Sequence, residues 1–201
     1  MPGRDNRHTR FMPSQFRAAR EDDGRRYIEG YFAVFGDIYE LWSGATESIA
    51  PTAFDGALND DIRALIDHRT EMVLGRSNNS VHTLELRVDS HGLWGCIEIN
   101  ENDIDATNIY ARLERGDVDQ ASFGFDILDE ETEYRDDGSV HWTIKKVKLY
   151  EVSVCTFPAY EATNLSARRD DYNNIKKRQA DIWRNKILRR IHNGTETDNA
   201  E

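Results

Sequence analysis

The chain has 201 residues, 38% of them hydrophobic and 10% aromatic, which fits one folded domain with extensions and excludes a chain that is disordered throughout. The formal net charge is −11, and residues 27–167 carry ten basic against 27 acidic side chains, so specific nucleic-acid binding by this region is excluded. No apolar run approaches the roughly 20 residues that a transmembrane helix needs, so we expect no membrane partner.

The first 26 residues are polar and contain seven Arg and four acidic side chains, and we predict a flexible lead-in at residues 1–26. This segment has no apolar h-region, so no secretory signal is predicted. Without export, Cys96 and Cys155 are expected to be free thiols in a reducing compartment. The sequence has no paired CxxC spacing, so we expect no zinc or other metal site. We also expect no cofactor.

Strand-like sequence begins at Tyr27. The segment YIEGYFAVFG mixes aromatic and β-branched residues with glycine, which favours a bent or bulged strand. The segment IAPTAFDGALND predicts a turn followed by a short helix, because Pro51 interrupts what precedes it and Thr52 is a suitable helix N-cap.

The middle of the chain alternates short strands with polar turns. The segments IRALIDH, MVLGRS and HTLELRV each have the length of a strand. Residues 90–92 predict a turn, which makes LWGCIEI the hairpin partner of the strand before it.

A helix interrupts this run of strands. Residues 102–115 carry apolar side chains at helical spacing, and Gly116 stands just past their end, as a helix C-terminus requires. After the helix, QASFGFDIL is predicted to be a strand. A turn at residues 137–138 then leads into HWTIKKVKLYEVSVCTF, which continues in strands.

The last part of the chain, residues 168–201, is predicted to form a basic amphipathic helix followed by a disordered tail. Residues 168–192 carry nine basic and three acidic side chains, and their apolar residues recur at near-helical spacing. We therefore predict one β-rich domain, at residues 27–167, between two extensions. Many short strands with few helices favour a closed barrel or a sandwich.

One serine stands out as a candidate nucleophile. In QASFGFDIL the apolar residues alternate with Ser122 and Gly124, which predicts that Ser122 lies on the wetter face of its strand. Gly124 has no side chain and leaves room for a substrate backbone. A serine on a half-buried strand is structural far more often than catalytic, and a catalytic one needs a base and a third group that holds the base.

His68 is the corresponding candidate base, because it lies where the strand IRALIDH passes into a turn. Histidine is the usual general base, since its unperturbed pKa of about 6.5 is close to the working pH. Of the other histidines, His141 lies in a strand pattern and fits a packed core residue. His82 lies in a polar, turn-like setting.

The strand YEVSVCTF begins with Glu151, and its alternation puts Ser153 and Cys155 on the same face as that carboxylate. A carboxylate on an otherwise apolar strand needs a partner, which is either a lysine of the same strand or a histidine N–H. Cys155 lies among apolar neighbours and fits a buried, inert thiol better than a catalytic one.

Taken together, these segments resemble the tailed-phage prohead protease family, whose members are related in fold to the herpesvirus assembly proteases. The resemblance runs from Tyr27 to Ala167. Each landmark is weak alone, but their order and spacing are specific. The landmarks are, in chain order, GYFAVFG, IAPTAFDGAL, LIDH followed by VLGR, ASFGF and LYEVSVCTFPAY.

The resemblance implies that Ser122 is the nucleophile and His68 its general base, and that Glu151 holds the His68 ring. His82 and His141 are alternative third members, because the herpesvirus relatives use a second histidine. The chain departs from the family in lacking a Pro just before LGR, so we expect a differently shaped loop at His68.

The resemblance also implies a fold, which is a mostly β, herpesvirus-protease-like closed β-barrel surrounded by a few helices. In the VLGR segment, Gly75 and Arg76 are candidate oxyanion donors by motif, with a turn role as the alternative.

The setting implied by the resemblance is the phage procapsid, inside the cytoplasm of the bacterial host. Such proteases cleave the scaffold or the scaffolding segment of the major capsid protein, and many cleave themselves. Those proteins are the implied substrates, and relatives of the assembly type suggest a homodimer. The resemblance implies no membrane partner and no specific nucleic acid.

Two other functions stay open at this point. A catalytically inert capsid-assembly or scaffolding protein could retain the protease fold and use its acidic core and basic helix as interaction surfaces. A cysteine hydrolase that uses Cys155 is the third hypothesis.

Overall fold

The computed structural model describes residues 8–13, 16–20 and 24–156, together with the single positions 173, 177, 180 and 184. Those four positions are helical, and the rest of the basic helix predicted within 168–201 lies outside the described residues. The elements are, in chain order, β1 (His8–Pro13), β2 (Arg17–Arg20), β3 (Arg26–Val34), β4 (Tyr39–Trp42), β5 (Ala45–Ile49), the 3-10 helix η1 (Ala57–Asn59), β6 (Ile62–Ile66), β7 (Arg69–Ser77), β8 (Leu84–Val88), β9 (Gly92–Glu98), α1 (Ile104–Arg115), β10 (Gln120–Tyr134) and β11 (Val140–Cys155).

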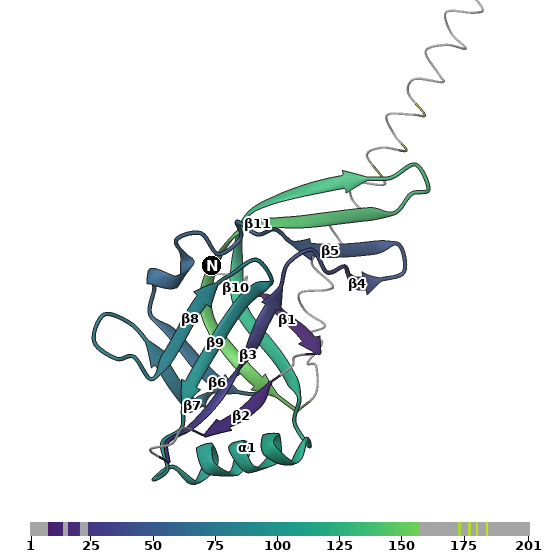
Figure 1. The fold of residues 1–201 in the computed structure, drawn as a ribbon. Coiled ribbons are helices and arrows are strands. Elements are labelled where there is room, and N and C mark those ends of the chain that lie inside the picture. The colour runs from purple at the N-terminus through teal and green to yellow at the C-terminus, as the bar shows by residue number, and fades with distance from the viewer. Residues whose placement is uncertain are drawn as a thin grey trace, which may run out of the picture. The chain divides into compact units, whose positions relative to one another are not determined.

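The first sheet has seven strands and is organised around β11 (Figure 1). On one side β11 pairs with β10 in antiparallel fashion along most of its length. On its other side it runs parallel to β5 at residues 140–144 and to β6 at residues 151–154. The strands β1, β4 and β7 extend this sheet from β10, β5 and β6 respectively. One strand therefore carries the ladder from the β4–β5 hairpin at one end to the β6–β7 hairpin at the other.

The second sheet has four strands in the order β2-β3-β9-β8, all antiparallel. One hydrophobic core is shared by the two sheets, because the buried residues of β3 and β9 cluster with those of β10 and β11. This burial fits the alternation of apolar side chains along each strand, which turns one set toward the core. Fully buried members include Ile28, Phe32, Leu93, Ile97, Phe123, Phe125, Val152 and Val154.

The expected closed β-barrel is not formed by the described residues, and both sheets are open. A barrel needs a neighbour on both sides of every strand, whereas β2 and β8 each pair on one side within the second sheet. The broader expectation of a mostly β fold is confirmed. The far half of the β10–β11 hairpin extends beyond the body of the fold, with β4 and β5 beside it (Figure 1). Its residues Val140, Trp142 and Ile144 are buried, and Ile144 belongs to the core cluster.

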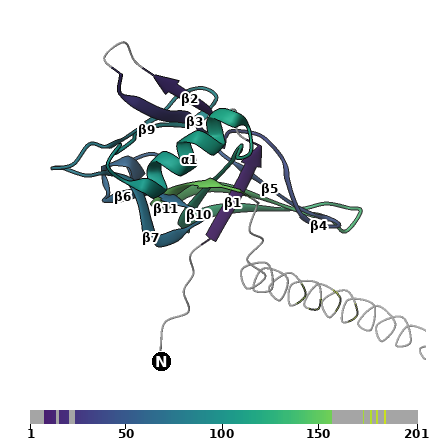
Figure 2. The ribbon, with the colours of Figure 1, turned by 90° about the horizontal axis from the view of Figure 1, so that it is seen from below.

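The predicted helix at residues 102–115 is confirmed as α1. Asp103 caps its N-terminus by accepting from two backbone N–H groups of the first turn, and Gly116 ends it with a φ of 85°. Figure 2 shows α1 lying across one end of the strands, where the Tyr110 hydroxyl donates to the backbone oxygen of Ala19 in β2. No helix among the described residues is long and apolar enough to cross a membrane.

Other local predictions also match the structure. The hairpin of β8 and β9 is present, and β3 contains the expected irregularity, between Tyr31 and Ala33. The lead-in differs from its prediction, because β1 and β2 lie within residues 1–26. Both strands add to the edges of existing strands, β10 and β3. Their backbone bonds come from long-range pairing, which a polar local sequence does not reveal.

Candidate functional site

Ser122 lies in β10, between two neighbouring strands. It pairs with Ser153 of β11 on one side and with Phe11 of β1 on the other. The prediction that Ser122 lies on a wetter face is wrong, because the residue is 0% exposed. Its Oγ has no hydrogen-bond partner among the described residues. A buried hydroxyl without a partner costs about 1–3 kcal/mol, so such a group calls for an explanation beyond packing.

His68 lies at the tip of the β6–β7 hairpin. Ile66 pairs with Arg69, which leaves a loop of two residues, Asp67 and His68. Both have positive φ, 49° and 59°, as a type I′ turn requires at its two central positions. That turn favours Asn-Gly, so an Asp-His pair is held there at a cost in backbone energy, which is a pattern typical of functional sites.

The turn brings His68 onto β11. His68 Nδ1 lies 2.6 Å from Oε1 of Glu151, and a carboxylate can only accept, so the ring nitrogen donates. The partner of Glu151 is therefore a histidine N–H, and not a lysine of the same strand. Glu151 is buried and the His68 side chain is 16% exposed. A short bond with this little solvent fixes both the tautomer and the orientation of the ring.

The β10–β11 register places four residues on one face of the sheet. Ser122 is directly opposite Ser153, and Gly124 is directly opposite Glu151. Directly paired residues of antiparallel strands point to the same side, with Cβ atoms about 4.5–5.5 Å apart. The face that bears the Ser122 hydroxyl is thus the face on which Glu151 meets the His68 imidazole. Sequence alternation predicted one polar face for Ser122 and Gly124 and another for Glu151 and Ser153. The pairing of β10 with β11 makes these a single face.

The two alternative third members lie elsewhere. His141 is ten residues before Glu151 in β11, which corresponds to about 33 Å along an extended strand. Its ring is bonded to Thr46 Oγ1 at 2.8 Å and to Ser48 Oγ at 2.9 Å. His82 is exposed and forms an isolated β-bridge with Ser77, the last residue of β7. Neither histidine joins the cluster around Glu151.

Ser48 and His141 form a hydrogen-bonded serine–histidine pair, which sequence reasoning missed. Its two members come from β5 and β11, 93 positions apart, and no local pattern predicts their parallel pairing. Both ring nitrogens of His141 are bonded to hydroxyl groups. A hydroxyl stabilises an imidazolium less well than a carboxylate does, so this pair is less suited to base catalysis than His68 with Glu151.

The two oxyanion candidates of the VLGR segment are part of β7. The Arg76 backbone N–H donates to Thr83 Oγ1, and its guanidinium forms two bonds to Asp61, of 2.7 and 2.6 Å. These contacts lower the pKa of Asp61. A Cβ at Gly75 would lie 2.8 Å from the backbone oxygen of Thr83, so this glycine permits close packing. Packing and ion pairing account for both residues.

Cys155 ends β11 and is 1% exposed. Burial raises the pKa of its thiol far above the usual value, with smaller contributions from Asp67 and Glu151. The thiolate is the nucleophilic form of cysteine, so this environment suppresses its reactivity. The structure agrees with the interpretation of Cys155 as a buried thiol and gives no support to a cysteine nucleophile.

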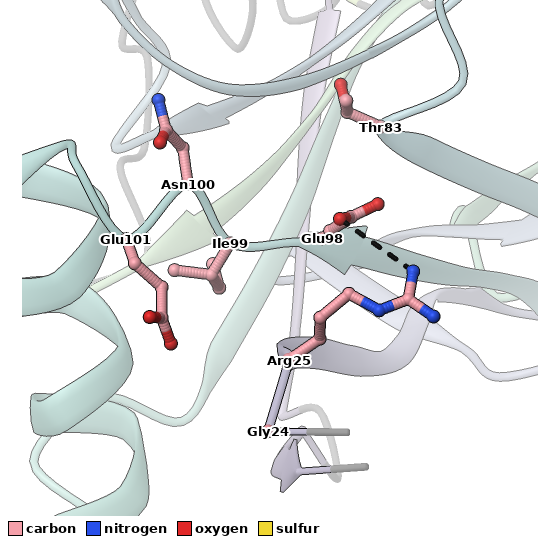
Figure 3. Close-up of a pocket in the computed structure, with 7 residues that line it drawn as sticks. All are labelled: Gly24, Arg25, Thr83, Glu98, Ile99, Asn100 and Glu101. Carbon is pink, nitrogen blue, oxygen red and sulfur yellow. Dashed lines mark ion pairs between the residues drawn. The ribbon is translucent and has the colours of Figure 1, made fainter. Parts of the chain in front are cut away.

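A surface cavity lies at the end of the second sheet, next to the loop that leads into α1. Figure 3 shows Arg25 and Glu98 facing each other across it, with Arg25 Nη1 4.0 Å from Glu98 Oε1. Neither Ser122, His68 nor Glu151 lines this cavity, so it is separate from the candidate site. Its lining residues are Gly24, Arg25, Thr83, Glu98, Ile99, Asn100 and Glu101. Among the described residues, no group of three or more acidic, histidine or cysteine side chains is placed to hold a metal ion.

Comparisons with known proteins point to one protein family. Residues 14–178 match the sequence model of a family described as caudovirus prohead serine protease. The chain is also similar to a protein named prohead protease from Enterobacteria phage HK97, with 28% identity over 152 residues. The aligned region is 73% of this chain and 62% of that relative, so the chain spans less than two thirds of the relative's length. No solved structure matches the chain.

Proposed function

Since the chain belongs to the caudovirus prohead serine protease family, we propose that it is a serine endopeptidase with Ser122 as nucleophile, His68 as general base and Glu151 as the residue that orients the base. The observation that carries this proposal is the 2.6 Å contact between His68 Nδ1 and Glu151 Oε1, on the sheet face that bears the Ser122 hydroxyl.

The chemistry follows from these roles. With its Nδ1 proton held by Glu151, the His68 ring presents Nε2 as the basic nitrogen. Ser122 Oγ attacks the carbonyl carbon of a peptide bond while its proton passes to Nε2. The protonated ring then gives that proton to the leaving amine, and the acyl group stays on Ser122. Water, activated by the same ring, releases the acyl group as a carboxylic acid and restores the hydroxyl.

The proposed substrates are the scaffold, or the scaffolding segment of the major capsid protein, and the protease itself. The support for this is the family's description, which places its members at the prohead. Enclosure of enzyme and substrate in a procapsid in the host cytoplasm would supply a high local concentration without a cofactor. We also propose a homodimer, because relatives of the assembly type suggest one.

A second candidate function is a catalytically inert assembly protein of the same fold. The observation that favours it is the complete burial of Ser122, because a nucleophile must meet its substrate. The protease proposal requires that substrate binding opens this position. The inert candidate requires no such opening.

Labelling with a fluorophosphonate separates the two candidates, since this probe reacts with activated serines by forming an Oγ–P bond and releasing fluoride. The wild-type chain is expected to be labelled, whereas Ser122→Ala and His68→Ala are not. Ser48→Ala and His141→Ala are the matched controls, because they break the contact between Ser48 and His141 and should leave labelling intact. An unlabelled wild type that still supports capsid assembly favours the inert candidate.

Co-expression with the capsid protein tests the substrate. Cleavage of the capsid or scaffold protein should appear on a gel with wild type and be absent with Ser122→Ala. Cleavage by Ser122→Ala equal to that of wild type would remove Ser122 from the mechanism.

A further inference from the structure

Ser153 contacts both the acid and the turn of the candidate site. Its Oγ donates to Glu151 Oε2 at 2.6 Å and accepts from the His68 backbone N–H at 3.3 Å. The residue is 0% exposed, so water does not compete for these bonds. The Ser153 hydroxyl thereby links the Glu151 carboxylate to the backbone of His68. The ring of the same His68 is held by that carboxylate.

The two oxygens of the Glu151 carboxylate have different partners. Ser153 occupies Oε2 and His68 Nδ1 occupies Oε1, so each oxygen has one strong partner. A carboxylate held at one oxygen only can rotate about its terminal torsion, which is a soft one. The bond from Ser153 removes that freedom and fixes the plane in which Oε1 meets the imidazole.

The second bond acts on the backbone. His68 has a φ of 59°, a conformation that residues with a Cβ rarely adopt, and its N–H points at Ser153 Oγ. Ser153 also lies directly opposite Ser122 in the ladder. Ser153, whose hydroxyl contacts the His68 backbone, is therefore paired with the proposed nucleophile Ser122 on the adjacent strand.

We propose that Ser153 is a positioning residue for the serine-protease reaction, a role that rests on the proposed function of Ser122, His68 and Glu151. It touches neither substrate nor the reacting atoms. It acts by holding the Glu151 carboxylate and the His68 turn in one fixed relation. Removal of its hydroxyl should slow the chemical step and leave binding of a small probe unchanged, because the displaced groups act after binding.

The experiment uses the 201-residue chain and a fluorophosphonate probe. It measures the labelling rate at saturating probe separately from the half-saturating probe concentration. Ser153→Ala is expected to lower the maximal rate by about 10²-fold, the scale of loss for a catalytic group displaced by about 1 Å, with the half-saturating concentration unchanged. Ser153→Thr keeps the hydroxyl and should recover part of the rate. Ser48→Ala, which removes another buried histidine-bonded serine hydroxyl from the same sheet, should label at the wild-type rate.

Thermal melting checks that each variant is folded. If Ser153→Ala does not fold, Ser153→Cys replaces the hydroxyl by a weak donor of similar size and is expected to show the same loss of maximal rate. A wild-type rate in Ser153→Ala or in folded Ser153→Cys overturns the role of Ser153 while the proposed function stands. Equal losses in Ser153→Ala and Ser48→Ala overturn it as well. Failure of wild type to label at all refutes the proposed function, and the role of Ser153 with it.

Discussion

Gly124 lies directly across the β10–β11 ladder from Glu151, and a Cβ at Gly124 would come 2.2 Å from Glu151 Oε1. That same oxygen accepts from His68 Nδ1. The missing side chain at position 124 is thus what allows the Glu151 carboxylate to lie over the neighbouring strand and reach the imidazole. The glycine of the ASFGF landmark therefore leaves room for the Glu151 carboxylate, a role that the sequence did not reveal.

Gly124→Ala is therefore expected to leave the fold intact and to abolish rapid labelling by a fluorophosphonate. The clash is with the end of a flexible side chain, so Glu151 can move aside, but only by leaving His68. We expect the labelling rate to fall to that of Glu151→Gln, about 10⁴-fold below wild type, as for the removal of a triad carboxylate.

The double variant Gly124→Ala with Glu151→Gln supplies the control. If the alanine acts through Glu151, its effect in the Glu151→Gln background should be close to zero, because interacting sites are not additive. Full additivity of the two losses would contradict this account of Gly124.

The local sequence was sufficient to predict α1, because both of its ends carry capping residues, Asp103 and Gly116. It was also sufficient to predict the strand pattern around Ser122 and Glu151. Alternation, however, says only which side chains share a face, and it does not say what covers that face. The prediction of a wetter face at Ser122 was wrong for this reason, since the residue is 0% exposed.

The relations within the site are long-range and could not be read from the sequence. The parallel pairing of β6 with β11 joins residues more than 80 positions apart, and it is this pairing that brings the His68 turn to Glu151. Ser153 was visible as a same-face neighbour of Glu151, but its bond to the His68 backbone depends on that pairing. Closure of the sheets into a barrel likewise depends on edge strands, for which short apolar segments carry no signal.

Asp67 is expected to position the His68 turn through a contact with the end of β11. Its carboxylate accepts from the Thr156 backbone N–H at 2.8 Å, and its own φ is 49°. Asp67→Asn keeps an acceptor and tolerates positive φ, so labelling should stay near the wild-type rate. Asp67→Ala loses both and should lower the free energy of unfolding by about 1–3 kcal/mol.

Asp67→Gly separates the two effects. Glycine adopts positive φ without strain but cannot bond to Thr156, so stability should be close to that of wild type while the labelling rate falls. Urea unfolding and labelling rates, measured on the same preparations, provide the comparison. A glycine variant that labels as fast as wild type would show that the Thr156 contact does not position His68.

The buried thiol of Cys155 predicts a loss of stability at alkaline pH. Its pKa in the folded protein is raised by burial, whereas an unfolded cysteine titrates at about 8.5. The folded state therefore keeps a proton that the unfolded state releases, and the stabilisation is fully present below pH 8.5 and declines above it. The decline should approach about 1.4 kcal/mol per pH unit.

The measurement is urea unfolding at pH 7.5 and pH 9.5, with wild type compared against Cys155→Ala. The difference between the pH dependences of the two proteins removes most of what other titrating groups contribute to the free energy of unfolding. The matched control is Cys96→Ala, which removes the half-buried thiol of β9 and should keep the wild-type dependence on pH. Equal slopes in wild type and Cys155→Ala would mean that Cys155 ionises in the folded protein.

Alkylation provides the decisive contrast between a serine and a cysteine nucleophile. In the native protein at pH 8, iodoacetamide should modify Cys96 and leave Cys155 unmodified, because Cys155 is 1% exposed and its thiol remains protonated. Mass spectrometry of the digested protein identifies the modified thiol, and the same sample is tested for fluorophosphonate labelling. We expect that labelling is unchanged by alkylation and is lost in Ser122→Ala.

Rapid modification of Cys155 with loss of hydrolysis, in a protein whose Ser122→Ala variant stays active, would instead establish the cysteine hydrolase. The physical basis for expecting the first result is that burial disfavours the thiolate on which a cysteine nucleophile depends, whereas Ser122 needs no prior charge, since its proton can leave for His68 during attack.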